Sequence, residues 1–375
     1  MATSLRIVHC FRAPVGGVFR HVRDLAVAQA AAGHQVGFIC DSTTGGALED
    51  RYFDAIAGSL ALGVTRMPIG RAIGPGDIAA GWRTYRLVKQ LRPDVLHGHG
   101  AKGGALARIF GSALRVSRFR VARLYSPHGG VLHFDPATVK GKALFALERL
   151  MDRMSDRFLF VSEFERRTFA QKIGGPKAPS EVIYNGLGPA EFDPVPPAPD
   201  AADFLYIGEM RALKGTDIFI DALDRASTAT GRPLTAVMVG SGEVETYAAR
   251  IERLGLGERI RMLPPMPARE AFALARLVVV PSRAEAMPYI VLEALAAGKP
   301  MIAAAVGGIP EIFGPTSPAL VAPDVEAVAA AMARAIRDEA AHAALMPARD
   351  DLRGRFGVET MAARVEAAYR LALAR

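Results

Sequence analysis

Two carboxylates stand eight residues apart, at Glu285 and Glu293, in the segment 281–311, which reads PSRAEAMPYIVLEALAAGKPMIAAAVGGIPE. A β-type run ends at Pro281, which predicts a loop holding Glu285 and then a helix holding Glu293 about a turn from its start. A carboxylate can accept two O–H donors at once and therefore suits paired sugar hydroxyls. The helix start offers N–H groups to a pyrophosphate, although Pro288 removes one of them.

A second group of candidates lies in residues 208–215, GEMRALKG, directly after another β-type run. Arg211 and Lys214 follow the expected strand end and could neutralise a diphosphate there. Glu285 could instead be an ordinary loop carboxylate and Glu293 an ordinary helix carboxylate. Arg211 and Lys214 could belong to a solvated turn. The buried-looking neighbours of Glu293 favour the functional interpretation for that residue.

Glycines and histidines occupy equivalent places in the first half of the chain. Gly16 and Gly17 follow the first expected strand and would let a ligand approach a helix start closely. His97, His99 and His128 lie at the ends of two later strands. No carboxylate or thiol accompanies these histidines at metal-ligand spacing, so hydrogen bonding to a sugar or phosphate is favoured over metal binding.

The elements that must position these residues alternate between short apolar strands and amphipathic helices, as in parallel α/β sheets. Five prolines then interrupt the pattern between Pro189 and Pro199, and the alternation begins again. Strands are expected at 5–10, 35–41, 94–99, 121–125, 157–162, 203–207, 236–239, 259–263, 277–281 and 300–304, and helices at 18–32, 76–91 and 357–374, among others. We therefore expect two doubly wound domains at 1–188 and 203–355, a Pro-rich linker at 189–202 and a final helix at 356–375.

The charge is concentrated in the first half, with a net charge of +9 in residues 1–200 and −1 in the remainder. Arg115, Arg118, Arg120 and Arg123 form the densest basic patch, which suggests an anionic partner or a solvated loop. Nucleic acid is a poor candidate, because no basic aromatic platform or helix-turn-helix pattern is present. Cys10 and Cys40 are expected to be buried and unpaired. There is no secretory signal and no stretch of roughly 18 apolar residues, so a cytoplasmic protein is expected.

Taken in order, these segments resemble the retaining, nucleotide-sugar-dependent glycosyltransferases of family 4. The similarity runs through PVGGVFRHVRDLAVAQAAAGHQV, DVLHGHG, YSPHGG, VIYNGL, IGEMRALKG and the E-x7-E segment ending GGIPEI. It implies the GT-B architecture, with two Rossmann-like α/β domains facing across a cleft and a last helix that crosses back to the first domain.

The resemblance also implies roles for single residues. Glu285 would hold the donor sugar and Glu293 the ribose, and Lys214 would bind the leaving pyrophosphate. Gly16 and Gly17 would line the cleft, His128 would contact the donor sugar, and Met287 and Tyr289 would lie in the donor site. Glu209 stands where the family usually has an arginine, which leaves Arg211 as the candidate substitute.

The expected activity is thus transfer of a hexose from a UDP-, GDP- or ADP-sugar to a glycan or lipid-linked acceptor, with retention and without a metal or other cofactor. A role in surface polysaccharide or glycolipid synthesis, with transient docking on anionic membrane, would suit the basic first half. The alternative is a nucleotide-sugar epimerase or hydrolase of the same architecture. A dehydrogenase is disfavoured because the G-x-G-x-x-G fingerprint is missing.

Overall fold

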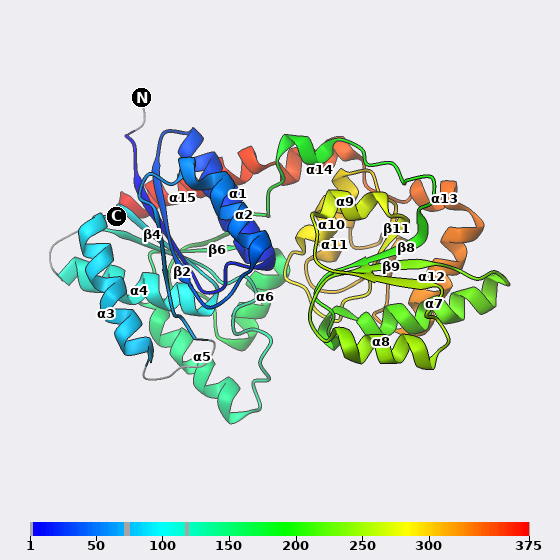
Figure 1. Cartoon of the computed structure of the whole chain (residues 1–375). Coiled ribbons are helices and arrows are strands. Elements are labelled where there is room, and N and C mark those ends of the chain that lie inside the picture. Colours follow the sequence, from blue (N-terminus) through cyan, green and yellow to red (C-terminus); the bar gives the residue numbers. More distant parts are fainter. Residues whose placement is uncertain (1–2, 71–75, 117–119, 375) are drawn as a thin grey trace. The chain divides into compact units, whose positions relative to one another are not determined.

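A computed structural model describes residues 3–70, 76–116 and 120–374. The chain divides into two compact units, each an α/β structure (Figure 1). The first unit comprises Met1–Gly186 together with Val358–Arg375, and the second comprises Leu187–Gly357. The backbone therefore passes between the units twice, at residues 186–187 and again at 357–358.

The first unit is built on a seven-stranded parallel sheet in the order β3-β2-β1-β4-β5-β6-β7. Its strands are β1 (Arg6–Phe11), β2 (Gln35–Asp41), β3 (Val64–Met67), β4 (Val95–His99), β5 (Ala122–Ser126), β6 (Arg157–Phe160) and β7 (Ser180–Val182). Its helices are α1 (Gly16–Ala31), α2 (Ala47–Ile56), α3 (Gly76–Leu91), α4 (Gly100–Val116), α5 (Val139–Asp152), α6 (Glu163–Lys172) and α15 (Val358–Leu373).

Helices cover both faces of this sheet, which explains why its strands are apolar in nearly every position. Side chains alternate between the faces along each strand. On one face Ile7 and Val95 pack with α15 and Leu25 of α1. On the other face Val8 and Leu96 pack with α3 and α4.

The second unit has a six-stranded parallel sheet in the order β10-β9-β8-β11-β12-β13. Its strands are β8 (Ala202–Ile207), β9 (Ala236–Val239), β10 (Ile260–Leu263), β11 (Ala275–Val280), β12 (Met301–Ala304) and β13 (Leu320–Val321). Its α-helices are α7 (Thr216–Thr230), α8 (Val244–Arg253), α9 (Ala268–Ala273), α10 (Tyr289–Ala296), α11 (Ile309–Phe313), α12 (Val325–Arg337), α13 (Glu339–Ala343) and α14 (Arg349–Phe356).

All ten strands expected from the sequence are present, with ends that differ by at most two residues. Three strands escaped sequence analysis: β3, β7 and β13. They lie at sheet edges and are only two to four residues long. An edge strand has one unpaired side, so it needs less of the continuous apolar sequence that marks a central strand.

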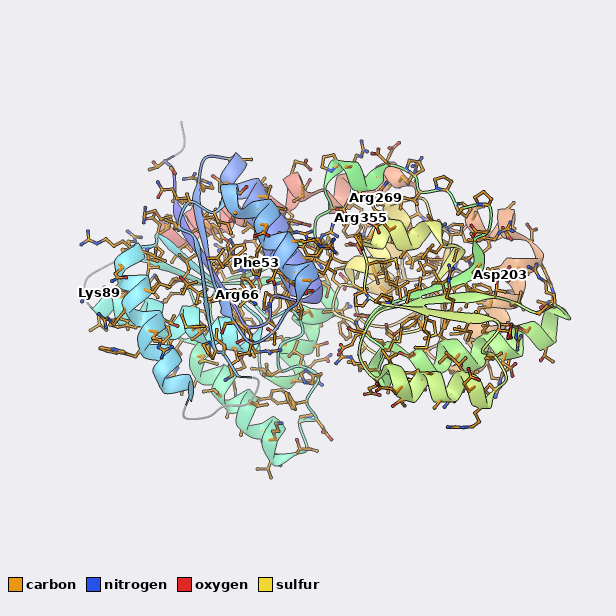
Figure 2. The ribbon with its side chains drawn as sticks, viewed as in Figure 1. Phe53, Arg66, Lys89, Asp203, Arg269 and Arg355 are labelled. Atoms are coloured by element: carbon orange, nitrogen blue, oxygen red, sulfur yellow. The ribbon has the colours of Figure 1, made fainter. Side chains whose placement is uncertain are left out.

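The Pro-rich segment 189–202 lies within the second unit rather than standing free as a linker. Val195 N–H donates to the Ala297 carbonyl (2.9 Å) and Ala198 N–H donates to the Ala273 carbonyl (2.8 Å). The Arg269 guanidinium, labelled in Figure 2, donates to the carbonyls of Glu191 (3.1 Å) and Asp193 (3.0 Å). Backbone N–H and carbonyl groups of this segment are thus hydrogen-bonded to residues of α9 and at the ends of α9 and α10.

The last helix, α15, belongs to the first unit, as Figure 1 shows in red. Met361, Val365, Ala368 and Tyr369 are buried in its core, with Tyr369 fully buried. Cys10 and Cys40 are buried and unpaired as expected. Within the described ranges, none of the helices has both the length and the apolar character required to cross a bilayer.

Candidate active site

In each sheet the strand order reverses at one point, and the loops leaving the strands there are where open α/β sheets bind ligands. The reversal lies between β8 and β11 in the second unit and between β1 and β4 in the first. Loops 208–215 and 281–288 follow β8 and β11. The parallel sheet therefore brings Lys214 and Glu285 to the same edge, although they are far apart in sequence.

Lys214 and Glu285 form an ion pair at this edge. Lys214 Nζ lies 2.7 Å from Glu285 Oε1 and 2.9 Å from Oε2, so the ammonium bridges both carboxylate oxygens. Ser282 Oγ donates to Glu285 Oε1 at 2.7 Å. The Glu285 side chain is 8% exposed and that of Lys214 is 27% exposed. A charged pair this sheltered is held in one geometry yet remains reachable by a ligand.

Two glycines allow the loops to approach so closely. Gly215 has φ +68°, and a Cβ there would lie 2.1 Å from the Pro281 carbonyl oxygen. Gly307, from the GGIPE segment, has φ +61°, and its Cβ would lie 1.7 Å from the Glu285 carbonyl oxygen. Neither position can hold a side chain without moving the loop that carries Glu285.

Arg283 is a functional candidate that sequence analysis missed. Its guanidinium binds both carboxylate oxygens of Asp217, each at 2.7 Å, and the Arg283 backbone N–H donates to the Leu213 carbonyl at 2.9 Å. The hydrogen bonds between these two side chains lower the pKa of Asp217 and raise the pKa of Arg283. Arg283 thus ties the loop of Lys214 to the loop of Glu285. Its position between Pro281 and Glu285 was the one available sequence signal.

The remaining donor-site candidates lie on or beside α10. Glu293 is the fifth residue of this helix and is half-buried, so it stands about a turn from the start as expected. Met287 and Tyr289 precede and open the helix and are both buried, at 5% and 7% exposure. Their burial indicates that they shape the site through packing more than through an exposed polar surface.

Arg211 is oriented toward Glu209. Its Nε lies 3.1 Å from Glu209 Oε2, and both side chains are partly exposed. Glu209, which departs from the family pattern, is therefore paired with Arg211, the arginine expected to replace the missing one. An anionic ligand would have to compete with Glu209 for this guanidinium.

In the first unit, Gly16 and Gly17 open α1 beside the reversal point between β1 and β4. Both are exposed, and Gly16 has φ +62°. Val15 precedes the helix and offers no side-chain cap. The first amides of α1 are therefore not capped by the preceding residue, as an anion site at a helix start requires.

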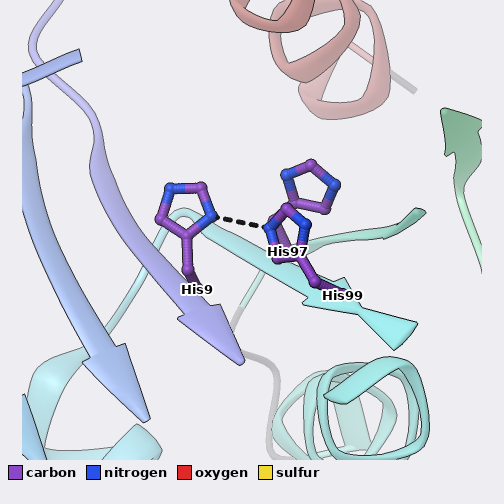
Figure 3. A group of neighbouring side chains, drawn as sticks. All are labelled: His9, His97 and His99. Atoms are coloured by element: carbon purple, nitrogen blue, oxygen red, sulfur yellow. Dashed lines mark hydrogen bonds between the residues drawn. The ribbon is translucent and has the colours of Figure 1, made fainter. Parts of the chain in front are cut away.

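The histidines expected at strand ends belong to a larger cluster of five, of which His9, His21, His97 and His99 are buried and His128 is half-buried. His99 Nδ1 lies 3.0 Å from His128 Nε2, and His9 Nδ1 lies 2.9 Å from His99 Nε2. His97, His99 and His9 lie on adjacent strands, as Figure 3 shows. His9 and His21 were not identified from the sequence, although His9 shares the alternation of a strand whose neighbours face α15.

Burial keeps the rings of this cluster neutral. It lowers the pKa of His9 and His21 to about 4 and holds the pKa of His97, His99 and His128 well below 6.5. A neutral imidazole carries one donor and one acceptor nitrogen. The cluster can therefore transmit hydrogen bonds without carrying charge.

Glu165 holds the loop that carries His128. Its carboxylate accepts from Gly129 N–H and from Val161 N–H, the latter at 2.9 Å. Burial raises the pKa of Glu165 to about 7 against these two hydrogen bonds, which lower it. His128 itself has φ +49°, a conformation that few non-glycine residues adopt. The ring is thus fixed by its backbone as well as by its partners.

Two groups of three histidines have ring nitrogens within 4.8 Å of one another: His9, His97 and His99, and His21, His99 and His128. Both ring nitrogens of His97 are already engaged, with Tyr369 Oη at 2.7 Å and Ser126 Oγ at 2.9 Å. His9 and His99 are equally engaged on both sides. A metal ion could bind the first group only by displacing those hydrogen bonds.

The basic patch proposed from the sequence is largely satisfied internally. Arg115 and Arg123 both pair with Asp156, at 2.7 Å and 2.9 Å. Arg120 is exposed, and Arg118 lies outside the described residues. Two of the four cations are therefore neutralised by an ion pair with Asp156. This residue directly precedes β6 and is distant from both arginines in the sequence, so the sequence did not reveal the pairing.

Models of two glycosyltransferase domains match the chain and between them cover most of it. The one described as Glycosyltransferase Family 4 matches residues 15–191, and the one described as Glycosyl transferases group 1 matches residues 201–338. The chain belongs to the family 4 glycosyltransferases. The fold and the resemblance drawn from the sequence are thereby confirmed.

Curated relatives of this glycosyltransferase have several activities. It is 28% identical to the glycogen synthase of Mycobacterium tuberculosis over 87% of this chain and 84% of that protein. It is also 28% identical to the D-inositol 3-phosphate glycosyltransferase of Kribbella flavida, over 74% of this chain and 71% of that one. The chain is therefore similar, at the same percentage identity, to two enzymes that are named for different activities.

Solved structures share the fold of this glycosyltransferase. HepE of Anabaena, solved with UDP and glucose, has a TM-score of 0.79 at 20% identity, covering 98% of this chain and 99% of that one. WaaG, a glycosyltransferase involved in lipopolysaccharide biosynthesis, has a TM-score of 0.68 at 16% identity, covering 98% and 96%. Both support GT-B architecture.

Gly307→Ala is expected to destabilise the second unit more than a control glycine replacement does. Gly298→Ala is the matched control, because Gly298 has φ +72° but open space where a Cβ would go. The control should cost about 1–2 kcal/mol for the left-handed backbone. Gly307→Ala should cost a further ~1–3 kcal/mol, since its Cβ meets the Glu285 carbonyl. Urea unfolding measures both, and equal costs would contradict the packing described for this loop.

The free energy of unfolding is expected to fall steeply as the pH drops from 6.5 toward 4. The five rings stay neutral in the fold but gain protons on unfolding below their ordinary pKa of 6.5. Each such histidine contributes a slope of about 1.4 kcal/mol per pH unit. Glu165 acts in the opposite sense between pH 7 and 4.5, because its pKa is raised, but it is one group against five.

Urea unfolding at pH 7.5, 6, 5 and 4.5 measures this slope. Replacing His97 by Gln should make it shallower, whereas replacing the exposed His133 by Gln should leave it unchanged. A slope equal in the His97→Gln variant and the parent chain would show that His97 is already protonated in the fold.

Proposed function

We propose that this glycosyltransferase transfers a hexose from a nucleotide-sugar donor to a glycan or lipid-linked acceptor, with retention of configuration and without a divalent metal. The observation that carries the proposal is the Lys214–Glu285 pair at the reversal point of the second sheet. Such a pair offers a cation for a diphosphate and a carboxylate for sugar hydroxyls within one hydrogen-bond length of each other.

In the proposed reaction the acceptor hydroxyl attacks the anomeric carbon from the face that the diphosphate leaves. The carbon–oxygen bond to the diphosphate breaks, and the departing phosphate oxygen takes the acceptor's proton. The products are a glycoside of unchanged configuration and a free nucleoside diphosphate. Within this scheme the protein positions the reactants and stabilises the charge that develops on the leaving group.

Each site residue takes a share of this work. Lys214 would release Glu285 to a sugar hydroxyl and turn to the diphosphate, aided by Arg211 once that side chain leaves Glu209. Glu293 would bind the ribose, with Met287 and Tyr289 forming the wall beside it. We propose that Gly16, Gly17 and His128 of the first unit contact the phosphates and the donor sugar, as the resemblance implies. The cations Lys214 and Arg211 would do the work of a metal.

The donor is proposed to carry UDP, GDP or ADP. UDP is the first candidate, because HepE has been solved with UDP and with UDP-glucose. The acceptor is proposed to belong to surface polysaccharide or glycolipid synthesis, in line with the role of WaaG in lipopolysaccharide biosynthesis. The site of action would then be the cytoplasm at the inner face of the membrane.

Helix α5 supplies a surface for docking on anionic lipid. Val139 and Leu150 are 86% and 58% exposed, and Lys140, Lys142, Arg149 and Arg153 are exposed around them. The acidic residues of this helix are turned inward: Glu148 pairs with the buried Arg108, and Asp152 is 6% exposed. An exposed helix face that is apolar and basic without acids suits the surface of an anionic membrane.

The donor proposal is tested by thermal shift with UDP, GDP, ADP and their sugar conjugates, with and without EDTA. A bound nucleotide should raise the melting temperature by mass action, and EDTA should not reduce the shift. Glu293→Ala should abolish the shift, whereas Arg253→Ala, an exposed position on α8, should retain it. Loss of the shift with EDTA would contradict metal independence, and no shift with any nucleotide would contradict the donor site.

A further variant, Lys214→Ala, separates binding from chemistry. With the donor identified, Lys214→Ala should lower kcat by about 10²–10³, the cost of removing one charge-stabilising donor. Unchanged turnover would show that Lys214 does not stabilise the leaving group. Consumption of the donor without any acceptor would instead favour the epimerase or hydrolase alternative.

Membrane docking is tested by co-sedimentation with vesicles of phosphatidylcholine alone and with anionic phosphatidylglycerol. Binding should require the anionic lipid and should fall with salt, because screening weakens it. Leu150→Glu should reduce it. Leu371→Glu, on α15 and similarly exposed at 54%, should not, since α15 covers the opposite face of the sheet. Equal loss in both variants would exclude α5 as the contact.

A further inference from the structure

Four side chains of the first unit form a linear series of hydrogen bonds. Gln29 Oε1 of α1 lies 2.8 Å from His9 Nε2, His9 Nδ1 lies 2.9 Å from His99 Nε2, and His99 Nδ1 lies 3.0 Å from His128 Nε2. Figure 3 draws the bond between the rings of His9 and His99. The series crosses the sheet from a helix to the loop after β5.

Each ring in the series is neutral, so each has one N–H and one bare nitrogen. In a chain of such rings, fixing one proton fixes all the others. Gln29 Oε1 is only an acceptor, so His9 Nε2 carries the hydrogen. His9 Nδ1 then accepts from His99 Nε2–H, and His99 Nδ1 accepts from His128 Nε2–H. The last nitrogen, His128 Nδ1, is left with its lone pair.

The Gln29 amide is also hydrogen-bonded to Tyr369 of α15. The Gln29 Nε2 group donates to Tyr369 Oη at 3.2 Å, and Tyr369 Oη lies 2.7 Å from His97 Nδ1. The hydroxyl that accepts from Gln29 donates to His97, whose Nε2–H then donates to Ser126 Oγ at 2.9 Å. Rotating the amide by half a turn would reverse every bond in both branches.

The free end of the series is also the part that a ligand can reach. His9, His97 and His99 are at most 1% exposed, whereas His128 is half-buried. Across the part of the chain that the structure describes, His128 Nδ1 has no protein hydrogen-bond partner. Glu165 and the left-handed backbone hold this ring in place.

We propose that Gln29 and Tyr369 are positioning residues that set the tautomer of His128. They keep its Nε2 protonated toward the interior and its Nδ1 as an acceptor for a hydroxyl of a sugar ligand. The contact between His128 and a sugar hydroxyl rests on the proposed function, whereas the tautomer of His128 does not. The C-terminal helix, through Tyr369, thus influences the proton on His128 through three intervening side chains.

The three rings of His9, His97 and His99 are also close enough to be metal ligands. Every one of their ring nitrogens already has a hydrogen-bond partner, so the proton chain accounts for the cluster without an ion. Metal binding remains a distinguishable outcome of the test, because a metal ligand nitrogen carries no hydrogen.

The test is NMR of the ligand-free full chain labelled with ¹⁵N-histidine, at pH 7.5, with metal content measured in parallel. Correlations within each ring identify the protonated nitrogen, and His128→Gln assigns the His128 signals by their loss. The expected spectrum has a single His128 tautomer with hydrogen on Nε2. Gln29→Met, which keeps the length but removes the amide, should give a mixture of tautomers, and Tyr369→Phe should do the same.

Gln90→Met is the control, at an exposed position on α3, and should leave the His128 signals unchanged. Amide spectra establish that each variant keeps its fold. Hydrogen on Nδ1 of His128 in the parent chain would overturn the proposal, as would an unchanged His128 tautomer in a folded Gln29→Met variant. Stoichiometric metal with bare nitrogens facing it on His9, His97 and His99 would overturn it too.

A kinetic measurement connects the tautomer to transfer. Gln29→Met should lower kcat by about tenfold, the worth of one hydrogen bond, while nucleotide binding measured by thermal shift is retained. The two proposals fail separately: absence of any transfer would contradict the proposed function and leave the spectrum interpretable. A normal kcat with mixed tautomers would overturn the role of His128 Nδ1 alone.

Discussion

The close packing of loops at the reversal point of the second sheet is the constraint on which its candidate site depends. Parallel strands deliver their carboxyl ends to one edge, and the loops there can carry chemistry only if backbone meets backbone. Gly215 against Pro281 and Gly307 against Glu285 leave no room for a Cβ. The Lys214–Glu285 pair exists because these contacts bring its two loops together.

The two units use their reversal points differently. The second unit places charge there, with Lys214, Glu285, Arg283 and Asp217 in two ion pairs. The first unit places neutral imidazoles behind its edge, and burial keeps them uncharged. The second sheet thus presents charged groups at its reversal point, whereas the first presents neutral hydrogen-bonding groups.

The uneven distribution of charge along the chain does not predict which charged residues are exposed in the fold. The first half is strongly basic, yet Arg108, Arg115 and Arg123 are engaged by Glu148 and Asp156. Exposed cations remain on α5, where the helix turns its own acids inward, and also on α3. Net charge along the sequence therefore does not locate the exposed cations, because it does not show which of them are paired with buried acids.

The sequence alone determined the strand–helix alternation, the two-domain α/β class and the positions of Glu285, Glu293, Lys214 and His128, because each depends on local pattern and on order along the chain. It did not determine edge strands such as β3, whose pattern is weak, nor the attachment of the Pro-rich segment to the second unit. Only the tertiary structure joined Lys214 to Glu285, Arg283 to Asp217, and Tyr369 through Gln29 to the histidine series. Those contacts span tens to hundreds of residues, and the physical reason is that sheet order, not sequence distance, decides which side chains meet.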